Sequence, residues 1–279
     1  MADQFIDDVG PILGVITVLA GLVGVTFLPV SVRRSLAFEY AEPTVLTAYT
    51  APFVHFSLSH LVGNLLVFLL TIGVIHHLGR RDGTPWILLG ALVVVLSAFP
   101  ATLSFLNLAI PRNGVTYGFS GVNMAFVGFL PIAIVQFIER RLRRSVDTTL
   151  LLASFFGSIA LVTGSAVPRS PISISVLIAA ATLTMVFGSW FVVGERRRTP
   201  RSRWLPVISD PSLLIGLGTW TAVLSVAFPS VAVSDGSVVN VYVHFVGYAL
   251  GFTTAYLGHE WGLLGDRPNT EASGGEIVG

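Results

Sequence analysis

The chain has 279 residues, of which 53% are hydrophobic and only 11% are charged, and its formal net charge is +1. Soluble globular proteins carry about twice that share of charged residues, so the composition indicates a helical membrane protein with several spans. The lack of cysteine excludes disulfides, thiolate nucleophiles and cysteine-ligated metals. Nothing in the charge pattern suggests a nucleic-acid partner.

Eight hydrophobic segments approach or exceed the ~20 residues that a helix needs to cross a bilayer. They cover residues 10–32, 55–78, 85–110, 117–138, 149–167, 171–194, 211–233 and 239–259. The segment from Arg33 to Val54 is only moderately apolar, and we expect it to form a large loop. The acidic N-terminus lacks the basic start of a signal peptide, so we expect the first span to be retained. We predict one membrane domain over residues 1–261 and a disordered cytoplasmic tail over residues 262–279.

The chain contains sixteen arginines and no lysine. Arginine and lysine are enriched in the cytoplasmic loops of membrane proteins. With the N-terminus inside, twelve of the sixteen arginines lie on the cytoplasmic side and four lie outside. An even number of spans returns the C-terminus to the inside. We therefore predict an integral membrane protein with both termini cytoplasmic. The complete absence of lysine is typical of a GC-rich genome, so we place the protein in a prokaryotic cell membrane.

The fourth hydrophobic segment contains a candidate nucleophile, Ser120, in the run Tyr-Gly-Phe-Ser-Gly at residues 117–121. A lone serine in a membrane helix usually bonds a carbonyl of its own helix or packs against a neighbour. At the start of a helix, however, the unpaired N–H groups and the positive end of the dipole would stabilise a tetrahedral oxyanion. Gly118 and Gly121 leave room for backbone and substrate to approach.

A candidate base, His244, lies near the start of the last hydrophobic segment and shares one helix face with Gly247 and Gly251. Small residues on that face allow close contact with a neighbouring helix. If that neighbour is the fourth span, Nε2 of His244 can reach the Ser120 hydroxyl and take its proton. A hydrogen-bonded structural histidine is the alternative. Asp235, the nearest acid, would lie ~13 Å away along a helix, so a Ser-His dyad is predicted rather than a triad.

The second hydrophobic segment carries His60 and Asn64 four residues apart, on one helix face. The predicted topology places both at the depth of Ser120 and His244. They form either an interhelical hydrogen bond or a pair of donors for an oxyanion, and the sequence leaves both interpretations open. We expect His76, His77 and His259 to lie at the interface rather than to bind a metal. His55 is closer to the site, and the sequence leaves open whether it only braces the start of the second span.

Taken together, three motifs resemble those of the rhomboid intramembrane serine proteases. Residues 55–64 (HFSLSHLVGN) are similar to the second transmembrane segment of that family. Residues 118–121 (GFSG) are similar to its nucleophile motif, and residues 244–251 (HFVGYALG) are similar to its last core helix. The resemblance implies an all-α six-helix core with a water-filled cavity open to the outer face. Here an extra helical pair within about residues 149–210 would enlarge that core to eight spans.

The resemblance also implies an activity, serine endopeptidase cleavage of the transmembrane segments of other proteins within the lipid bilayer, without a cofactor or a metal. Ser120 would be the nucleophile and His244 the general base. His60 and Asn64, with the backbone around Gly118 and Ser120, would bind the oxyanion and the substrate.

Four features depart from the family pattern. The first outer loop lacks Trp-Arg, Met124 stands where many members have tyrosine, Asn123 is an added polar residue, and three spans rather than one separate the two catalytic helices. A proteolytically inactive relative that binds membrane clients is therefore an alternative. A small-molecule transporter is a further alternative, although the chain shows no repeated halves.

Overall fold

The computed structural model describes residues 2–82, 86–110, 113–167, 170–228, 233–234, 237–238 and 240–264. Its α-helices are α1 (Ala2–Thr26), α2 (Val30–Leu36), α3 (Val45–Thr50), α4 (Leu58–Asp82), α5 (Trp86–Leu106), α6 (Ser120–Leu142), α7 (Thr149–Ala166), α8 (Pro171–Arg198), α9 (Arg201–Ile208), α10 (Pro211–Ala227) and α11 (Val241–Glu260). Two 3-10 helices are η1 (Ala51–Phe53) and η2 (Asn107–Ala109). Strand β1 (Phe38–Glu39) pairs antiparallel with β2 (Val115–Thr116), and β3 (Val233–Ser234) pairs antiparallel with β4 (Ser237–Val238). The predictions for Asp235, for the arginines at 112, 169 and 267, and for most of the C-terminal tail (residues 265–279) concern residues outside this description.

Five of the described helices are long and apolar enough to cross a membrane, namely α1, α4, α5, α6 and α8. Helices α9 and α10 meet at a 64° bend and together could form a sixth span. The protein is thus an all-α polytopic integral membrane protein. Each of the eight hydrophobic segments contains a helix. Two of these helices, α7 and α11, are not among the candidate spans, and the apolar stretch of α7 is shorter than a full span.

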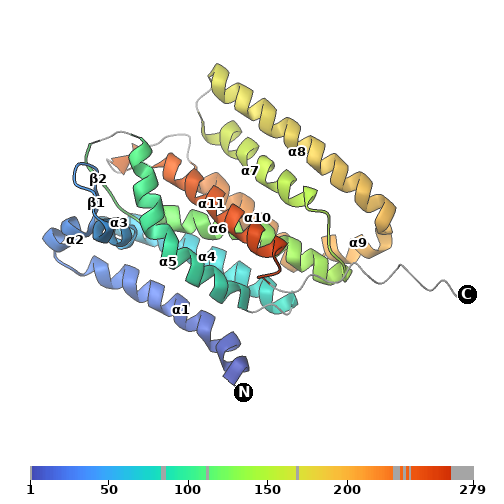
Figure 1. The fold of residues 1–279 in the computed structure, drawn as a ribbon, viewed down its shortest axis with the longest axis horizontal. Helices are drawn as coiled ribbons and strands as arrows, with labels where there is room; N and C mark the ends of the chain where they lie inside the picture. The colour runs from blue at the N-terminus through green and yellow to red at the C-terminus, as the bar shows by residue number, and fades with distance from the viewer. Residues whose placement is uncertain are drawn as a thin grey trace, which may run out of the picture.

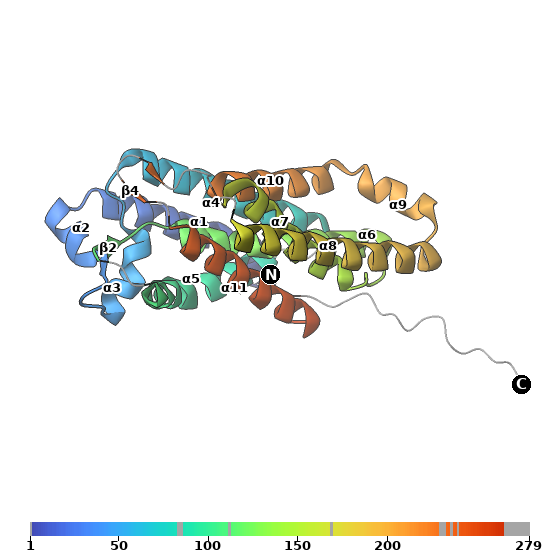
Figure 2. The same ribbon diagram turned by 90° about the horizontal axis from the view of Figure 1, so that it is seen from above.

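The centre of the bundle is α6, whose membrane-spanning window is entirely buried. Apolar residues are distributed around the whole of this helix, as expected for a helix surrounded by other helices. Figures 1 and 2 show it among α4, α5, α10 and α11, and it packs against each of these four. Residues at the start of α6 are therefore held from several directions.

Small residues allow α6 and α11 to lie in direct backbone contact. A Cβ atom added to Gly247 would overlap the carbonyl of Gly121, and one added to Gly251 would overlap the carbonyl of Ala125. On the α6 side, a Cβ on Gly128 would overlap the backbone of α11. Helix backbones approach this closely in membranes only where side chains are absent. The face of α11 that begins with His244 therefore lies against the helix that begins with Ser120.

The first connection is more ordered than the large loop expected from the sequence. It contains α2, β1, α3 and η1. Part of the reason is local, because the Thr44 and Thr47 side chains form reciprocal caps that start α3. The rest is a long-range contact, because Phe38 is fully buried where β1 pairs with the distant strand β2. Because β2 precedes Ser120 by only a few residues, this connection supports the entry to α6.

Helices α7 and α8 form a hairpin at the edge of the molecule (Figure 1), and α8 is only 6% buried over its membrane-spanning window. The two helices pack mainly against each other. A buried hydrogen bond of 2.6 Å between the hydroxyls of Ser158 and Tyr248 ties α7 to α11. The hairpin is thus a peripheral addition to the group of helices around α6.

The arginine-rich ends of several helices meet at the end of the bundle opposite Ser120. Asp210, which caps the start of α10, pairs with Arg141 of α6 at 3.0 Å and with Arg81 of α4 at 3.8 Å. Arg144 pairs with Glu195 of α8 at the same end. Nearby, His259 is buried within 3.6 Å of Glu139 rather than lying at an interface, because the ends of α6 and α11 cover it.

Candidate functional site

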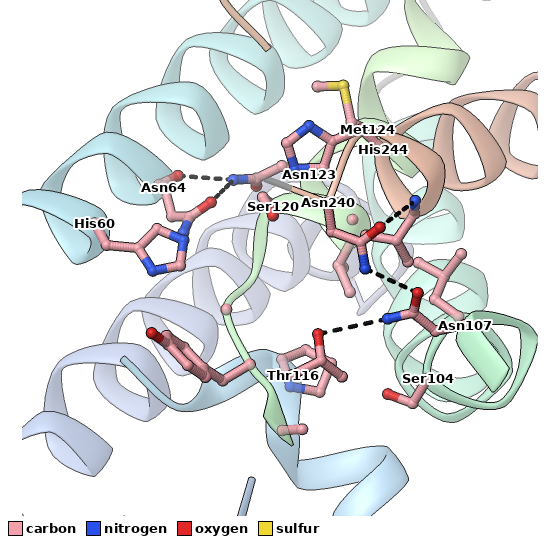
Figure 3. A pocket seen from close by; sticks show the side chains of 18 of the residues that line it. His60, Asn64, Ser104, Asn107, Thr116, Ser120, Asn123, Met124, Asn240 and His244 are labelled. Atoms are coloured by element: carbon pink, nitrogen blue, oxygen red, sulfur yellow. Dashed lines mark hydrogen bonds between the residues drawn. The ribbon is translucent and has the colours of Figure 1, made fainter. Parts of the chain in front are cut away.

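A pocket of about 1150 Å³ opens around the N-terminal end of α6. Its lining includes Ser120, His244, His60 and Asn64, which come from three helices. Figure 3 shows His60 and Asn64 on one side of Ser120 and a second set of polar residues on the other. Gly118 and Gly121 also line the pocket, whereas Gly247 and Gly251 lie deeper, at the contact between α6 and α11.

Ser120 is the first residue of α6 and is half-buried at the pocket wall. Gly118, two residues earlier, has φ +101°, a left-handed conformation that favours glycine, and its N–H donates to the carbonyl of Ala51 at 3.1 Å. This turn sets the entry angle of the helix. The N–H groups of the first turn have no acceptor inside the helix, so they remain available beside the hydroxyl. Ser120 Oγ forms no hydrogen bond with any residue that the structure describes.

His244 lies in the first turn of α11, where Asn240 caps the helix by accepting from the N–H of Val243. The imidazole is buried, and its Nδ1 lies 2.7 Å from the carbonyl oxygen of Ala227. A carbonyl can only accept, so Nδ1 carries the proton and Nε2 of the neutral ring keeps its lone pair. The ring of Phe228 contacts the imidazole edge to face at 5.9 Å.

No hydrogen bond between Ser120 and His244 is present among the described side chains. Figure 3 shows both groups in the same part of the pocket, at the adjacent ends of α6 and α11. In substrate-free enzymes, the bond between a nucleophile and its base is often long and shortens only when substrate binds. The arrangement is therefore compatible with a Ser-His pair.

On the α4 side, Asn64 is the centre of a buried hydrogen-bonded chain. Its Nδ2 donates to Nε2 of His55 at 2.9 Å, and Nδ2 of Asn123 donates to its Oδ1 at 3.2 Å and to its backbone oxygen at 2.9 Å. His55 Nδ1 lies 3.3 Å from the carbonyl of Phe53, which again requires a proton on Nδ1. An amide nitrogen has two hydrogens, so Asn64 keeps one donor for the pocket after serving His55.

The hydrogen-bond partners of two of these residues, Asn123 and His55, were not predicted from the sequence. Asn123 donates a hydrogen bond to the side-chain oxygen of Asn64. His55 accepts a hydrogen bond from the side-chain nitrogen of Asn64, in addition to its place at the start of α4. One signal was available: a buried asparagine in an apolar helix needs a hydrogen-bond partner. The identity of that partner depends on the packing of α6 against α4 and has no local pattern.

His60 lies directly against the turn that precedes Ser120. A Cβ added to Gly118 would overlap Cε1 of the His60 ring and would lie 2.9 Å from its Nε2. The imidazole also contacts the Tyr117 ring at 5.9 Å and the His55 ring at 4.9 Å, both edge to face. Gly118 is thus required for its backbone conformation and for the close approach of the imidazole.

A second polar cluster, absent from the sequence prediction, lines the opposite side of the pocket. Asn240 donates through Nδ2 to Oδ1 of Asn107 at 2.8 Å, and Asn107 donates to the hydroxyl of Thr116 at 3.5 Å. Figure 3 shows this chain running from the start of α11 to β2. It links the cap of the helix that carries His244 to the segment that leads into Ser120.

The described lining of the pocket contains no aspartate or glutamate. In the part of the chain that the structure describes, no three His, Cys, Asp or Glu side chains gather as metal ligands would. Met124, four residues after Ser120, is buried and lies 3.3 Å, at its Cβ, from a Cβ placed on Gly247. It therefore fills the contact between α6 and α11 just below the site.

No protein-family model, curated protein or solved structure matches this chain.

Proposed function

We propose that this chain is an intramembrane serine endopeptidase of rhomboid type that cuts transmembrane segments of other membrane proteins. One observation carries the proposal: Ser120 begins a helix whose membrane-spanning window is buried, and it lines the same pocket as His244, whose Nδ1–H donates to a carbonyl. That hydrogen bond leaves the lone pair of Nε2 for the serine proton. Serine is a nucleophile only when such a base is present.

The proposed reaction is acyl transfer through Ser120. His244 Nε2 takes the proton of the hydroxyl as Oγ attacks the scissile carbonyl carbon, and the carbonyl oxygen becomes an oxyanion. The Ser120 N–H, His60 and the second hydrogen of Asn64 are the proposed donors to that oxyanion. The His244 imidazolium then gives its proton to the leaving amine, which breaks the peptide bond. Water, deprotonated by the same histidine, hydrolyses the acyl-enzyme.

The proposed core consists of α1, α4, α5, α6, α10 and α11, with α7 and α8 as the extra pair and eight spans in all. It is supported by the packing of α10 on both α4 and α6, whereas α7 and α8 pack mainly on each other. Twelve of the sixteen arginines would be cytoplasmic, as would both termini. The pocket would then open on the outer side of a prokaryotic cell membrane, and cleavage would occur near the outer end of the substrate helix.

The decisive experiment incubates the purified protein in lipid vesicles with a model single-span substrate. The parent protein should cleave it and should be labelled by a fluorophosphonate probe, whereas Ser120→Ala and His244→Ala should each lose both properties while remaining folded. The double variant should be little worse than either single variant, because the two residues act as one unit. Cleavage by Ser120→Ala at the parent rate would overturn the proposal.

A second candidate, an inactive relative that binds membrane clients, is favoured by the absence of a hydrogen bond between Ser120 and the His244 ring among the described residues. It predicts binding of the substrate helix without cleavage and without fluorophosphonate labelling. A transporter would instead show solute flux across the vesicle membrane.

A further inference from the structure

The imidazole of His244 is oriented by a neighbouring helix rather than by an acidic side chain. Its Nδ1 lies 2.7 Å from the carbonyl oxygen of Ala227, which is the last residue of α10. No acidic residue is present in the described lining of the pocket. The position that a carboxylate occupies in a Ser-His-Asp triad is thus taken by a backbone oxygen.

The end of a helix is well suited to this task. The last four carbonyls of a helix have no N–H donor within it, and the helix dipole places partial negative charge there. The Ala227 carbonyl can therefore accept a hydrogen bond from Nδ1–H without losing a hydrogen bond within its own helix. The partial negative charge also favours the imidazolium that forms when the histidine takes the serine proton, which is one role of a triad aspartate.

The position of this carbonyl is set by the packing of α10. A Cβ added to Gly216 would lie 3.2 Å from Ile134 of α6 and 3.4 Å from Leu78 of α4, so α10 lies close to both helices. At its far end, Asp210 pairs with Arg141 at 3.0 Å. Next to Ala227, the Phe228 ring is buried and packs on the imidazole. The acceptor is thus held by a helix anchored along its length.

We propose that the Ala227 carbonyl, at the end of α10, is the positioning group that holds His244 with its proton on Nδ1. This inference rests on the proposed protease function, in which Nε2 must keep a lone pair for the serine proton. Without the carbonyl, the proton could move to Nε2, and the histidine could no longer act as a base toward Ser120.

The experiment replaces Phe228 by phenyllactic acid, its α-hydroxy analogue. The aromatic ring is retained, but the Ala227 carbonyl becomes part of an ester and accepts hydrogen bonds more weakly. We expect kcat and the rate of fluorophosphonate labelling to fall together by roughly 2- to 10-fold, with little change in KM. The matched control places the same analogue at Phe27, which is 84% exposed just beyond the end of α1, and should leave both rates unchanged.

A second measurement reads the tautomer directly. The ¹⁵N spectrum of histidine-labelled protein, with the His244 signals assigned by their loss in His244→Gln, should show the proton on Nδ1 in the parent and a shift toward Nε2 in the Phe228 ester. A parent with its proton on Nε2 would overturn the inference, as would equal kcat for a cleaving parent and its Phe228 ester. A parent that neither cleaves nor is labelled would overturn the proposed function instead.

Discussion

The side-chain amide of Asn64 donates to Nε2 of His55, nine residues earlier in the chain, at 2.9 Å. Both side chains are buried, and His55 lies in the connection before α4 begins. The candidate oxyanion donor is therefore itself oriented by a neutral histidine, whose other nitrogen faces the carbonyl of Phe53. An amide held in this way has lost much of its rotational freedom before any substrate arrives.

This contact predicts that His55 acts through Asn64. His55→Asn keeps a donor near Phe53 but removes the acceptor for Asn64, whereas His55→Gln places an acceptor near the position of Nε2. We expect kcat to fall roughly 5- to 10-fold in the asparagine variant and to be largely restored in the glutamine variant, with KM little changed in either. Steady-state kinetics and melting temperatures would be measured together. Equal losses in the two variants, in proportion to their melting temperatures, would show a purely structural role.

The two proposed side-chain donors should differ in importance. Removal of an oxyanion donor lowers kcat by roughly 10²- to 10³-fold and changes KM little. We expect His60→Ala to be the more severe change, because Asn64 already uses one of its two hydrogens for His55. Kinetics of His60→Ala and Asn64→Ala would test this. Variants that melt well below the parent yet keep a near-normal kcat would assign both residues to packing and leave the oxyanion to backbone groups.

The contact between α6 and α11 should tolerate no added methyl group. Gly251→Ala would place a Cβ against the carbonyl of Ala125, so the helices must separate, at a cost of about 1–3 kcal/mol or more. Because His244 lies on the same face of α11, activity should fall together with the melting temperature. Gly188→Ala is the matched control, since a Cβ at that position of α8 meets nothing within 4 Å. A fully active and stable Gly251→Ala protein would contradict the observed packing.

Acid should weaken the start of α7 through Asp147. The N–H and hydroxyl of Thr149 donate to its carboxylate at 3.0 and 2.8 Å and, with Arg198, hold the pKa of Asp147 below its usual 3.8, although partial burial opposes the shift. A lowered pKa stabilises the folded state above pH 3.8, and this stabilisation is lost as the pH falls through the folded-state pKa. Asp147→Asn should therefore melt below the parent at pH 7, and the two should converge in acid. Parallel melting curves across the pH range would contradict this account.

The proposed orientation can be tested because the chain contains no cysteine. An impermeant thiol reagent applied to intact cells should label Ser237→Cys, at the end of the molecule that carries the pocket, and should not reach Ser202→Cys, in α9. The physical reason is the arginine asymmetry, which favours the cytoplasm for the loop that contains Ser202. The reverse labelling pattern would contradict the proposed orientation.

Some properties of this protein follow from local sequence. The membrane class follows from composition, and the positions of the eight hydrophobic helices follow from the length of each segment. A helix forms all its backbone hydrogen bonds within one segment, so its position can be predicted without knowledge of its neighbours. The start of α6 at Ser120 also has a local cause, since Gly118 adopts a backbone conformation that favours glycine. The first connection was less predictable, because β1 requires β2, which lies more than seventy residues later.

Only the tertiary structure decided which groups meet in the pocket. The chain of His55, Asn64 and Asn123 joins two helices and a connection, and the bond of His244 to Ala227 joins α11 to α10. Neither set of contacts follows from a periodic sequence pattern. A backbone carbonyl cannot be identified as a partner from the sequence, since every residue carries one. The sequence by itself determined a serine at the start of an apolar helix and a histidine on a small-residue face. The packing of α4, α10 and α11 around α6 determined which nitrogen of that histidine is engaged.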